Sequence, residues 1–509
     1  MEHSLLTLLI FFPAAGALSL LFIPRALELR RRWLIPALAF AASLIEFGFS
    51  LTLFCYFDPS SHLLQLAQKQ SWISSLGVSY FVGIDGISFW LILLTTFLTP
   101  LVIAASEVRE RQRAYLASLL ALETAMIGAF VAIDLFLFYI FWEMMLIPMY
   151  FIIGIWGGAR RLYATVKFFI YTLAGGIVML LGIIFLIYLH YEQFGFFSAS
   201  MLDLYAVDIP FDFSVLSAQS LLFLAFALAF LIKIPMFPFH TWLPDAHVEA
   251  PTGGSVILAG VLLKMGAYGF LRLALPLFPQ AFRFFTPGLI VLALIGVIYG
   301  AFLALAQKDL KKLIAYSSIS HMGLVMLGLF VLNVHGVSGS IYQMLAHGLS
   351  TGALFLMVGM IYERRHTKEI SEFGGLTAVM PLFAVFFLII LLASIALPST
   401  NGFVGEFLIL VGAFQKHPLY AVLGGTTAVL GAYYMLRMYQ KVMFGPITQE
   451  VNRGLKDLSL KEMAVLIPIV ILIFWMGMYP KPFLNRMEKS VDYLVTHYQN
   501  YELGVYEEK

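Results

Sequence analysis

Eight ionisable side chains stand within long runs of apolar residues, where no water stabilises a charge. They are Glu46, Glu123, Glu143, Lys233, Lys264, His321, His347 and Glu406. A charge at the centre of a bilayer costs at least about 2.5 kcal/mol, and such residues face the bundle interior and mark ion or proton pathways. Carboxyl, ammonium and imidazole groups all exchange protons, so the set indicates proton transfer.

Glu143 and Lys233 form the first candidate pair, an acid and a base expected at similar depth. Lys233 directly precedes the proline-containing stretch 235–238, where carbonyls at the end of a helix become available to hold an ammonium group. We therefore expect an ion pair between the two side chains. The alternative is a purely structural pair, but buried ion pairs are poor stabilisers and need another reason to persist.

Lys264, His321, His347 and Glu406 form a second candidate set, spread over four apolar runs. Lys264 has no acid within a turn on its own helix, and burial disfavours a charged lysine, so this group can take up and release a proton. A single buried histidine is more often a packing residue. Two histidines between Lys264 and Glu406 predict a relay, because histidine titrates nearest to neutral pH.

Three further ionisable residues have weaker assignments. Glu46 and Glu123 belong neither to a broken helix nor to a repeated segment, so we expect each to contact a neighbouring subunit or to form an internal hydrogen bond. Arg272 lies near the outer end of its apolar run and is expected to anchor there by extending its side chain to the membrane interface.

The loop from His240 to His247 contains two histidines and Asp245, a combination that occurs in metal sites. One carboxylate and two imidazoles without a further clustered ligand are a weak zinc signature. The chain also lacks a Gly-Lys-Ser phosphate loop and a dinucleotide-binding glycine motif, and Cys55 is its only cysteine. We therefore expect no metal and no redox cofactor here, and an energy source in another polypeptide.

The elements that must position these groups are membrane helices. Of 509 residues, 61% are hydrophobic and 12% charged, which excludes a secreted scaffold, a nucleic-acid binder and a disordered chain. Fourteen apolar runs of about 20 residues can each cross a hydrocarbon layer of roughly 30 Å as a helix, which predicts an all-α polytopic membrane protein. The predicted spans are residues 4–23, 33–55, 82–105, 114–133, 135–155, 166–189, 217–244, 254–276, 286–306, 313–332, 338–362, 379–415, 418–440 and 462–479.

Prolines interrupt two of these runs, at Pro235 and Pro238 in the seventh and at Pro398 in the twelfth. Proline removes an amide donor and clashes with the preceding turn, so each helix must break or kink there. A packing kink explains many single membrane prolines. Broken backbone at membrane depth is otherwise tolerated only where protein or a polar cavity satisfies it.

An internal repeat links the two broken runs. The segment 266–273 recurs as 431–438 at an offset of 165, and Pro235 falls on Pro398 at an offset of 163. Five spans then match the next five, and because five is odd the second unit must insert upside down, as in transporters built from inverted repeats with broken helices. The predicted division is N-terminal helices in 1–113, a first repeat in 114–276, a second in 286–440, and a last helix with a tail in 441–509.

Basic residues flank the spans unevenly. If the N-terminus is outside, 21 of the 31 Lys and Arg lie at the inner side, around residues 25–32, 109–113, 160–167, 308–312, 364–368 and 437–461, and seven at the outer side. Because loops rich in Lys and Arg stay inside, we expect both termini on the outer side of the membrane.

Four stretches carry a resemblance to a known family. They are FWEMM (141–145), PFHTWLPDAH (238–247) with APT (250–252), LIAYSSISHMG (313–323) and NGFVGEF (401–407). Through them the chain resembles the antiporter-like membrane subunits of the proton-pumping NADH:quinone oxidoreductase, respiratory complex I, over essentially its whole length. Sister subunits and sodium/proton antiporter homologues carry a lysine where this chain has Glu406, so the acid points to one subunit type.

The resemblance implies a hydrated axis of charged residues at mid-membrane, driven by quinone reduction elsewhere in the complex. It implies that Glu143 and Lys233 are the coupling pair, that Lys264 is the central proton carrier, that His321 and His347 connect, and that Glu406 is the terminal site. It also implies a hetero-oligomer with antiporter-like neighbours on both sides, in the bacterial inner membrane with both termini periplasmic. The alternative is a subunit of a multi-subunit sodium/proton antiporter, and a membrane-bound hydrogenase subunit comes third.

Overall fold

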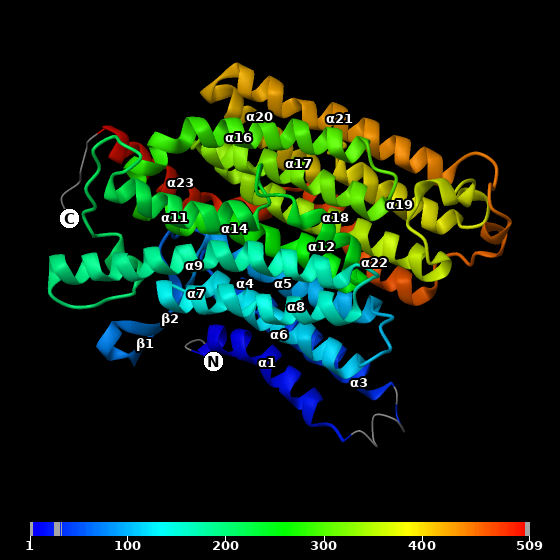
Figure 1. Ribbon diagram of the computed structural model, residues 1–509, viewed down its shortest axis with the longest axis horizontal. Coiled ribbons are helices and arrows are strands. Elements are labelled where there is room, and N and C mark those ends of the chain that lie inside the picture. The colour runs from blue at the N-terminus through cyan, green and yellow to red at the C-terminus, as the bar shows by residue number, and fades with distance from the viewer. Residues whose placement is uncertain (1–3, 25–30, 32, 504–509) are drawn as a thin grey trace.

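A computed structural model describes residues 4–24, 31 and 33–503 of the chain. In this part, twelve helices are long and apolar enough to cross a membrane, and two shorter apolar helices, Ala218–Lys233 and Pro381–Ser394, accompany them. Most of these helices run side by side along the long axis of an elongated bundle (Figure 1). The predicted all-α, multi-span fold is therefore confirmed, whereas the count of fourteen crossings stays a prediction.

Each predicted span falls on one helix or on a series of shorter ones. The helices before the first break are α1 (Leu5–Phe22), α3 (Leu34–Leu51), α4 (Leu53–Tyr56), α5 (Gly86–Ala105), α6 (Gln112–Val131), α7 (Leu135–Met144), α8 (Leu146–Trp156), α9 (Arg161–Phe194), α10 (Met201–Leu204) and α11 (Ala218–Lys233). Those that follow are α12 (Trp242–Glu249), α13 (Thr252–Ile257), η3 (Leu258–Leu262), α14 (Leu263–Gly269), η4 (Phe270–Ala274), α15 (Leu275–Leu277), α16 (Pro279–Leu305), α17 (Leu310–Phe330), α18 (Val334–Arg365), α19 (Pro381–Ser394), α20 (Asn401–Lys416), α21 (Pro418–Met443), α22 (Leu460–Met478) and α23 (Lys481–Leu503).

A β-hairpin that the hydrophobic pattern did not predict precedes α5. Strand β1 (Gln65–Ile73) pairs antiparallel with β2 (Val78–Ile84). Asp85 follows β2 and caps α5, because its carboxylate accepts hydrogen bonds from two backbone amides of the first turn. The predicted span 82–105 therefore begins too early, since its first residues belong to the strand and the helix starts at Gly86.

The segment after the last span is also helical. Helix α23 packs against α5 and α18, and the indole Nε1 of Trp90 on α5 donates a hydrogen bond of 2.9 Å to the carbonyl of Phe483. The amide of Gly86 donates to Ser490 Oγ at 3.0 Å. The expected tail is thus fastened to the start of α5, next to the hairpin.

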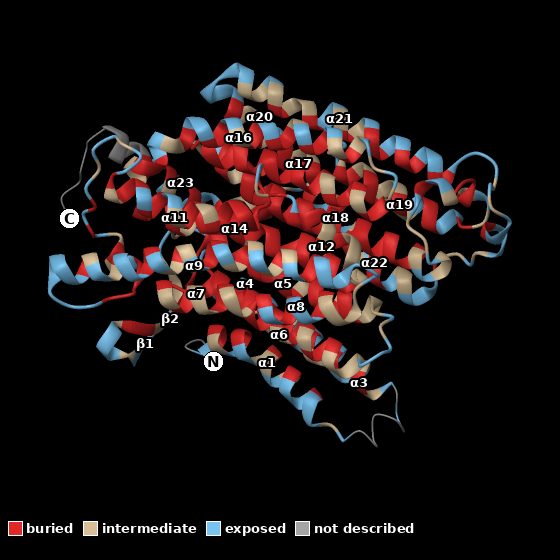
Figure 2. Cartoon of the chain, in the orientation of Figure 1, coloured by how far each residue is buried: buried red, intermediate tan, exposed pale blue. Residues whose placement is uncertain are grey.

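The most enclosed helices lie in the centre of the bundle. Nearly all of α13 to α15, α17 and α18 is buried, whereas most residues of α1, α3, α21 and α22, at the periphery, are exposed or only partly buried (Figure 2). Lys264, His321 and His347 belong to the central group, on α14, α17 and α18. The core therefore surrounds the predicted second set of ionisable residues.

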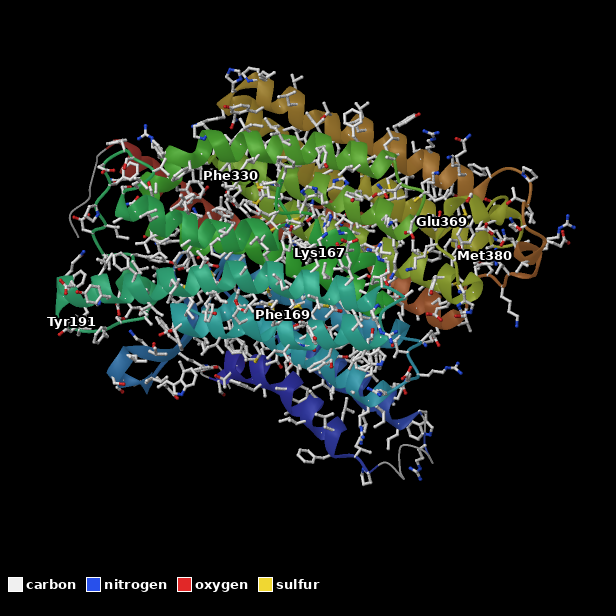
Figure 3. All side chains as sticks on the ribbon, in the orientation of Figure 1. Lys167, Phe169, Tyr191, Phe330, Glu369 and Met380 are labelled. Atoms are coloured by element: carbon white, nitrogen blue, oxygen red, sulfur yellow. The ribbon has the colours of Figure 1, made fainter. Side chains whose placement is uncertain are left out.

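The loops gather at the two ends of the bundle. The hairpin, the C-terminal end and the end of α9 near Tyr191 lie at one end, and the loops around Glu369 and Met380 lie at the other (Figures 1 and 3). The predicted outer and inner basic loops are thus separated. Arg25, Arg30 and Arg32 lie outside the described residues, and which end faces the cytoplasm stays a prediction.

Candidate proton-transfer site

The first break separates α11 from α12, and Lys233 is the last residue of α11, as predicted. Two side chains donate to backbone carbonyls on either side of the break. Trp242 Nε1 donates to the Ile232 carbonyl near the end of α11 at 2.9 Å, and Lys167 Nζ donates to the Thr241 carbonyl at the N-cap of α12 at 2.9 Å. Such partners are what broken backbone in a membrane requires. Lys167, expected as an inner-side flanking charge, is thus also part of the support of the break.

The second break, between α19 and α20, is built in the same way as the first. Three backbone hydrogen bonds recur 161 positions later, with donors Ile234 and Ile395, Met236 and Leu397, and Phe239 and Thr400. This agreement supports the repeat, although it places the two units in a register of 161 rather than 163 or 165. In that register the interrupting prolines do not coincide, so the hydrogen-bond pattern and not proline position is what the two breaks share.

Glu143 and Lys233 lie near each other without the expected ion pair. The two side chains are close enough for the charge of each to act on the other. Neither Glu143 Oε1 nor Lys233 Nζ, however, has a hydrogen-bond partner in the described part of the chain. The ammonium instead lies over the indole ring of Trp142, 4.8 Å from its centroid, a cation–π contact. The two groups are therefore close enough to respond to one another and are not locked together.

Lys264 is completely buried between two π-helical turns, η3 and η4. Its ammonium donates to the carbonyl of Ala259 within η3 and lies 2.9 Å from Nδ1 of His347. π-Helical turns are rare and are frequent at functional sites. Here η3 supplies the carbonyl that holds the lysine in place, a feature that no residue pattern had indicated.

His347, His321 and Glu406 continue the line from Lys264. The rings of His347 and His321 have centroids 5.9 Å apart, and His321 Nδ1 lies 3.2 Å from Glu406 Oε1. Gln343 Nε2 donates to the same oxygen at 3.2 Å. None of the four ionisable side chains is more than 5% exposed at its surface. The structure thus brings the whole predicted second set together, with both histidines between Lys264 and Glu406.

A further buried histidine extends this line in the other direction. His247 on α12 has no hydrogen-bond partner on either ring nitrogen among the described residues, and it stacks on Phe355 with centroids 4.5 Å apart. It is within range of the charges of Lys264 and Lys311. Lys311, expected at the inner side, is buried at the start of α17, where Nζ donates to the Ala250 carbonyl at 2.7 Å.

The other side chains of the 240–247 loop have separate partners. Asp245 pairs with Lys167 at 2.8 Å, while His240 lies against the rings of Phe237 and Tyr299. The sequence motif had drawn attention to His247 as a weak candidate metal ligand. In the structure it lies within range of the charges of Lys264 and Lys311, which stand elsewhere in the sequence.

Arg272 has an acidic partner that the sequence did not indicate. Its guanidinium lies 2.7 Å from Asp85 Oδ1, and Nε donates to Tyr268 Oη at 3.1 Å. The pair ties η4 to the cap of α5 beside a cavity of about 990 Å³. The expected anchoring at the membrane interface stays a prediction.

Glu46 and Glu123 are both completely buried inside the chain. The expected contact with a neighbouring subunit is wrong, because neither side chain has exposed surface. The expected internal hydrogen bond is missing for Glu46, whose two carboxyl oxygens have no partner within the described residues, whereas Glu123 lies beside the Thr99 hydroxyl.

Comparison with known proteins places this arrangement in a family. The model of the NADH:quinone oxidoreductase/Mrp antiporter transmembrane region matches residues 132–431, and that of the amino terminus of NADH-ubiquinone oxidoreductase chain 4 matches residues 17–129. The chain belongs to the NADH:quinone oxidoreductase/Mrp antiporter family. A relative in Rhodobacter capsulatus, NADH-quinone oxidoreductase subunit M, is 44% identical over 504 residues, 97% of each chain. This is the subunit type that Glu406 indicated.

Solved structures of the family share the fold. A chain of respiratory complex I from Thermus thermophilus with bound NADH is 32% identical, with a TM-score of 0.85 over 96% of this chain and 99% of that one. A chain of the Mrp complex from Dietzia sp. DQ12-45-1b has a TM-score of 0.83 over 98% and 99%, at 20% identity. The second likeness concerns the fold alone.

Proposed function

We propose that the chain is a proton-translocating membrane subunit of an NADH:quinone oxidoreductase, and that it performs no redox step itself. The observation that carries the proposal is the buried line Lys264–His347–His321–Glu406, whose neighbouring groups lie within or near hydrogen-bond reach. Four proton-exchanging groups in contact have no packing purpose that apolar side chains would not serve better. Curated relatives named as subunit M of this enzyme agree with it.

The relay uses a specific atom at each step. Lys264 as ammonium donates through Nζ to Nδ1 of a neutral His347, whose ring then loses its other proton from Nε2. His321 faces Glu406 through Nδ1, so its own Nε2 is the atom that receives from His347. Both Nε2 atoms are buried without a partner among the described residues. One water is enough to connect them if the rings do not meet directly.

Protons reach Lys264 from the end of the bundle at which α17 begins. Lys311 stands at the start of that helix, and His247 lies within range of both Lys311 and Lys264. Both ring nitrogens of His247 are without hydrogen-bond partners among the described residues, so the ring can accept a proton on one nitrogen and release another from the opposite nitrogen. This gives Lys264 a supply separate from the group to which it donates.

Glu143 and Lys233 control the relay as a switchable pair. In the present arrangement Lys233 rests on Trp142 at the end of α11, and α11 packs against α14, which carries Lys264. If Lys233 moves to Glu143, the positive charge near Lys264 withdraws and Lys264 holds its proton more firmly. A return of Lys233 to the break favours release of that proton to His347.

The redox energy comes from other subunits of a hetero-oligomer in the bacterial inner membrane, with both termini of this chain on the periplasmic side. The proposed division into N-terminal helices 1–113, repeats 114–276 and 286–440, and a last section 441–509 assigns one broken helix to each repeat. The alternative, a sodium/proton antiporter subunit, has support here from the family description, which includes the Mrp antiporter, and from a shared fold at 20% identity.

Reconstituted vesicles containing the assembled enzyme test the proposal. Glu143→Ala, Lys233→Ala and Lys264→Met should each abolish most proton uptake coupled to quinone reduction by NADH, while the subunit stays in the complex. Sodium uptake without quinone-coupled proton movement would instead support the antiporter subunit. Normal proton pumping in all three variants would overturn the role assigned to this line.

A further inference from the structure

Helix α3 has polar residues on its buried face and large apolar residues on its exposed face. Its buried residues follow one face, and three of them in succession are polar: Ser43, Glu46 and Ser50. The opposite side is apolar and exposed, with Leu44 and Ile45 about half exposed. A helix at the edge of a membrane bundle is expected to be apolar toward lipid, but this one also buries a carboxyl group, that of Glu46.

The face of α3 meets a second carboxyl group and several hydroxyls. Helix α3 packs against α5 and α6, and Ser50 Oγ lies 2.7 Å from Thr96 Oγ1 of α5. Glu123 of α6 is within range of the charge of Glu46, and the Thr99 hydroxyl of α5 faces Glu123. Two fully buried carboxyl groups, on helices far apart in sequence, therefore lie in the same polar region between α3, α5 and α6.

Two of the surrounding hydroxyls use their own proton on a backbone carbonyl. Ser43 Oγ donates to the Phe40 carbonyl at 3.0 Å, and Thr99 Oγ1 donates to the Thr95 carbonyl at 3.0 Å. A hydroxyl has a single proton to donate, so each of these presents acceptor lone pairs to its surroundings. An ionised carboxylate needs donors, whereas a protonated carboxyl can donate to such acceptors.

Positive side chains are also missing from this region. Helices α1, α4 and α5, which pack near α3, contain no Lys, Arg or His, and α3 itself contains none. Arg113, the only such residue on α6, stands in the first turn, where its guanidinium donates to the Ile23 carbonyl at 2.7 Å. Within the described residues, then, the helices that pack against α3 place no cation beside the two carboxyl groups. Lys264 is on α14, which also packs against α6, but its ammonium is held by the Ala259 carbonyl and lies against His347.

From this arrangement we propose that Glu46 and Glu123 form a second proton-binding site, in which at least one of the two carboxyl groups stays protonated. Two carboxylates buried within range of each other's charge, with no cation beside them, cannot both stay ionised. The site is separate from the Lys264 line and does not rest on the proposed function.

Infrared difference spectroscopy on the purified assembly tests the site, because protonated and ionised carboxyl groups absorb in different regions. The spectrum of the wild type minus that of the double variant Glu46→Gln, Glu123→Gln should contain a protonated-carboxyl band that shifts in deuterated water. Glu107→Gln is the control, since Glu107 is about half exposed and paired with Lys461 at 2.8 Å. Its difference spectrum should contain carboxylate bands only.

A difference spectrum of the double variant with carboxylate bands alone would overturn the proposal. Carboxylate bands that change when sodium is replaced by choline would overturn it in favour of a sodium site. If the double variant does not assemble, the two single variants decide: at least one must lose protonated-carboxyl intensity, and loss of carboxylate intensity alone in both contradicts a bound proton.

Discussion

The ammonium of Lys264 lies 2.9 Å from Nδ1 of His347, across the boundary between the two predicted repeats. Lys264 is on α14, within the unit 114–276, and His347 is on α18, within the unit 286–440. One contact between two buried groups thus joins the halves of the chain. A proton that crosses it passes from the first unit to the second.

Replacement of His347 tests this contact. His347→Gln retains an acceptor for Lys264 but cannot take up and pass on a proton, so we expect quinone-coupled pumping to fall by at least about tenfold. Proton uptake by vesicles, measured with the rate of NADH oxidation, gives the ratio. His335→Gln on the same helix, an exposed residue, is the control and should retain normal pumping. Equal pumping in both variants would remove His347 from the relay.

Glu406 should tolerate a lysine better than an alanine. Glu406→Lys keeps a titratable group beside His321, and a rotated Gln343 amide can present its unpartnered Oε1 to the new ammonium. Glu406→Ala leaves no such group. The pumping rate of the lysine variant should therefore lie between those of the wild type and the alanine variant. The same loss in both would count against a proton-carrying role at this position.

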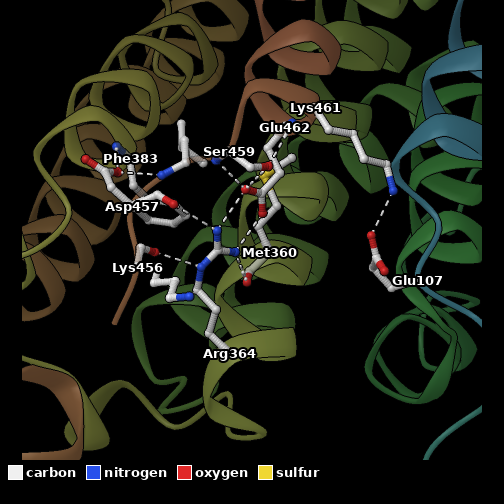
Figure 4. A network of polar contacts seen from close by, with 10 residues as sticks. Glu107, Met360, Arg364, Phe383, Lys456, Asp457, Ser459, Lys461 and Glu462 are labelled. Atoms are coloured by element: carbon white, nitrogen blue, oxygen red, sulfur yellow. Dashed lines mark hydrogen bonds and ion pairs between the residues drawn. The ribbon is translucent and has the colours of Figure 1, made fainter. Parts of the chain in front are cut away.

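The network around Arg364 predicts a difference in stability rather than in transport. Arg364 at the end of α18 holds both carboxylate oxygens of Glu462 on α22, at 2.6 and 2.8 Å, and also donates to the carbonyls of Lys456 and Asp457 (Figure 4). Arg364→Met should lower the stability of the chain by about 1.5 to 3 kcal/mol, because charge-assisted bonds in a partly buried site are lost.

Lys461→Met is the matched control in the same region. Its ion pair with Glu107 is about half exposed, and such pairs contribute roughly 0 to 1 kcal/mol. Thermal unfolding of the assembled complex, followed by the release of this subunit, should distinguish the two variants. Similar unfolding temperatures would show that the Arg364 network does not hold the two helix ends together.

The sequence predicted features that follow from the bilayer itself. Span positions came from apolar length, and the breaks came from prolines and from the polar residues beside them. The distances between side chains on different helices could not be predicted, because they depend on how each helix is rotated. That is why the order of the two histidines, with His347 next to Lys264, was not predicted, and why the expected Glu143–Lys233 ion pair did not appear.

Elements that owe their form to tertiary contacts also escaped prediction. The β1–β2 hairpin lies outside the apolar runs, and the π-helical turns beside Lys264 have no distinct composition. The sequence placed Lys167 and Lys311 among the charges that flank the inner side, because they stand next to predicted membrane spans. Each also donates to a backbone carbonyl in the region from 241 to 250, which only the folded chain brings near them.

Gly176 on α9 sets the position of the Glu143 carboxylate. A Cβ at this glycine would collide with Glu143 Oε1, so Gly176→Ala must displace the acid without changing its chemistry. If the coupling role of Glu143 depends on its position relative to Lys233, pumping should fall in Gly176→Ala nearly as far as in Glu143→Gln. NADH oxidation and the amount of assembled complex should fall much less.

Gly154→Ala on α8 is the control for this substitution. Its added Cβ would meet Thr165 Oγ1 at an ordinary distance of 3.4 Å, so the helices need not move. Proton uptake per NADH oxidised, measured for both alanine variants in the same vesicles, separates displacement of the acid from a general effect of alanine. If Gly176→Ala pumps as well as Gly154→Ala, the carboxylate of Glu143 does not need the position that the fold gives it.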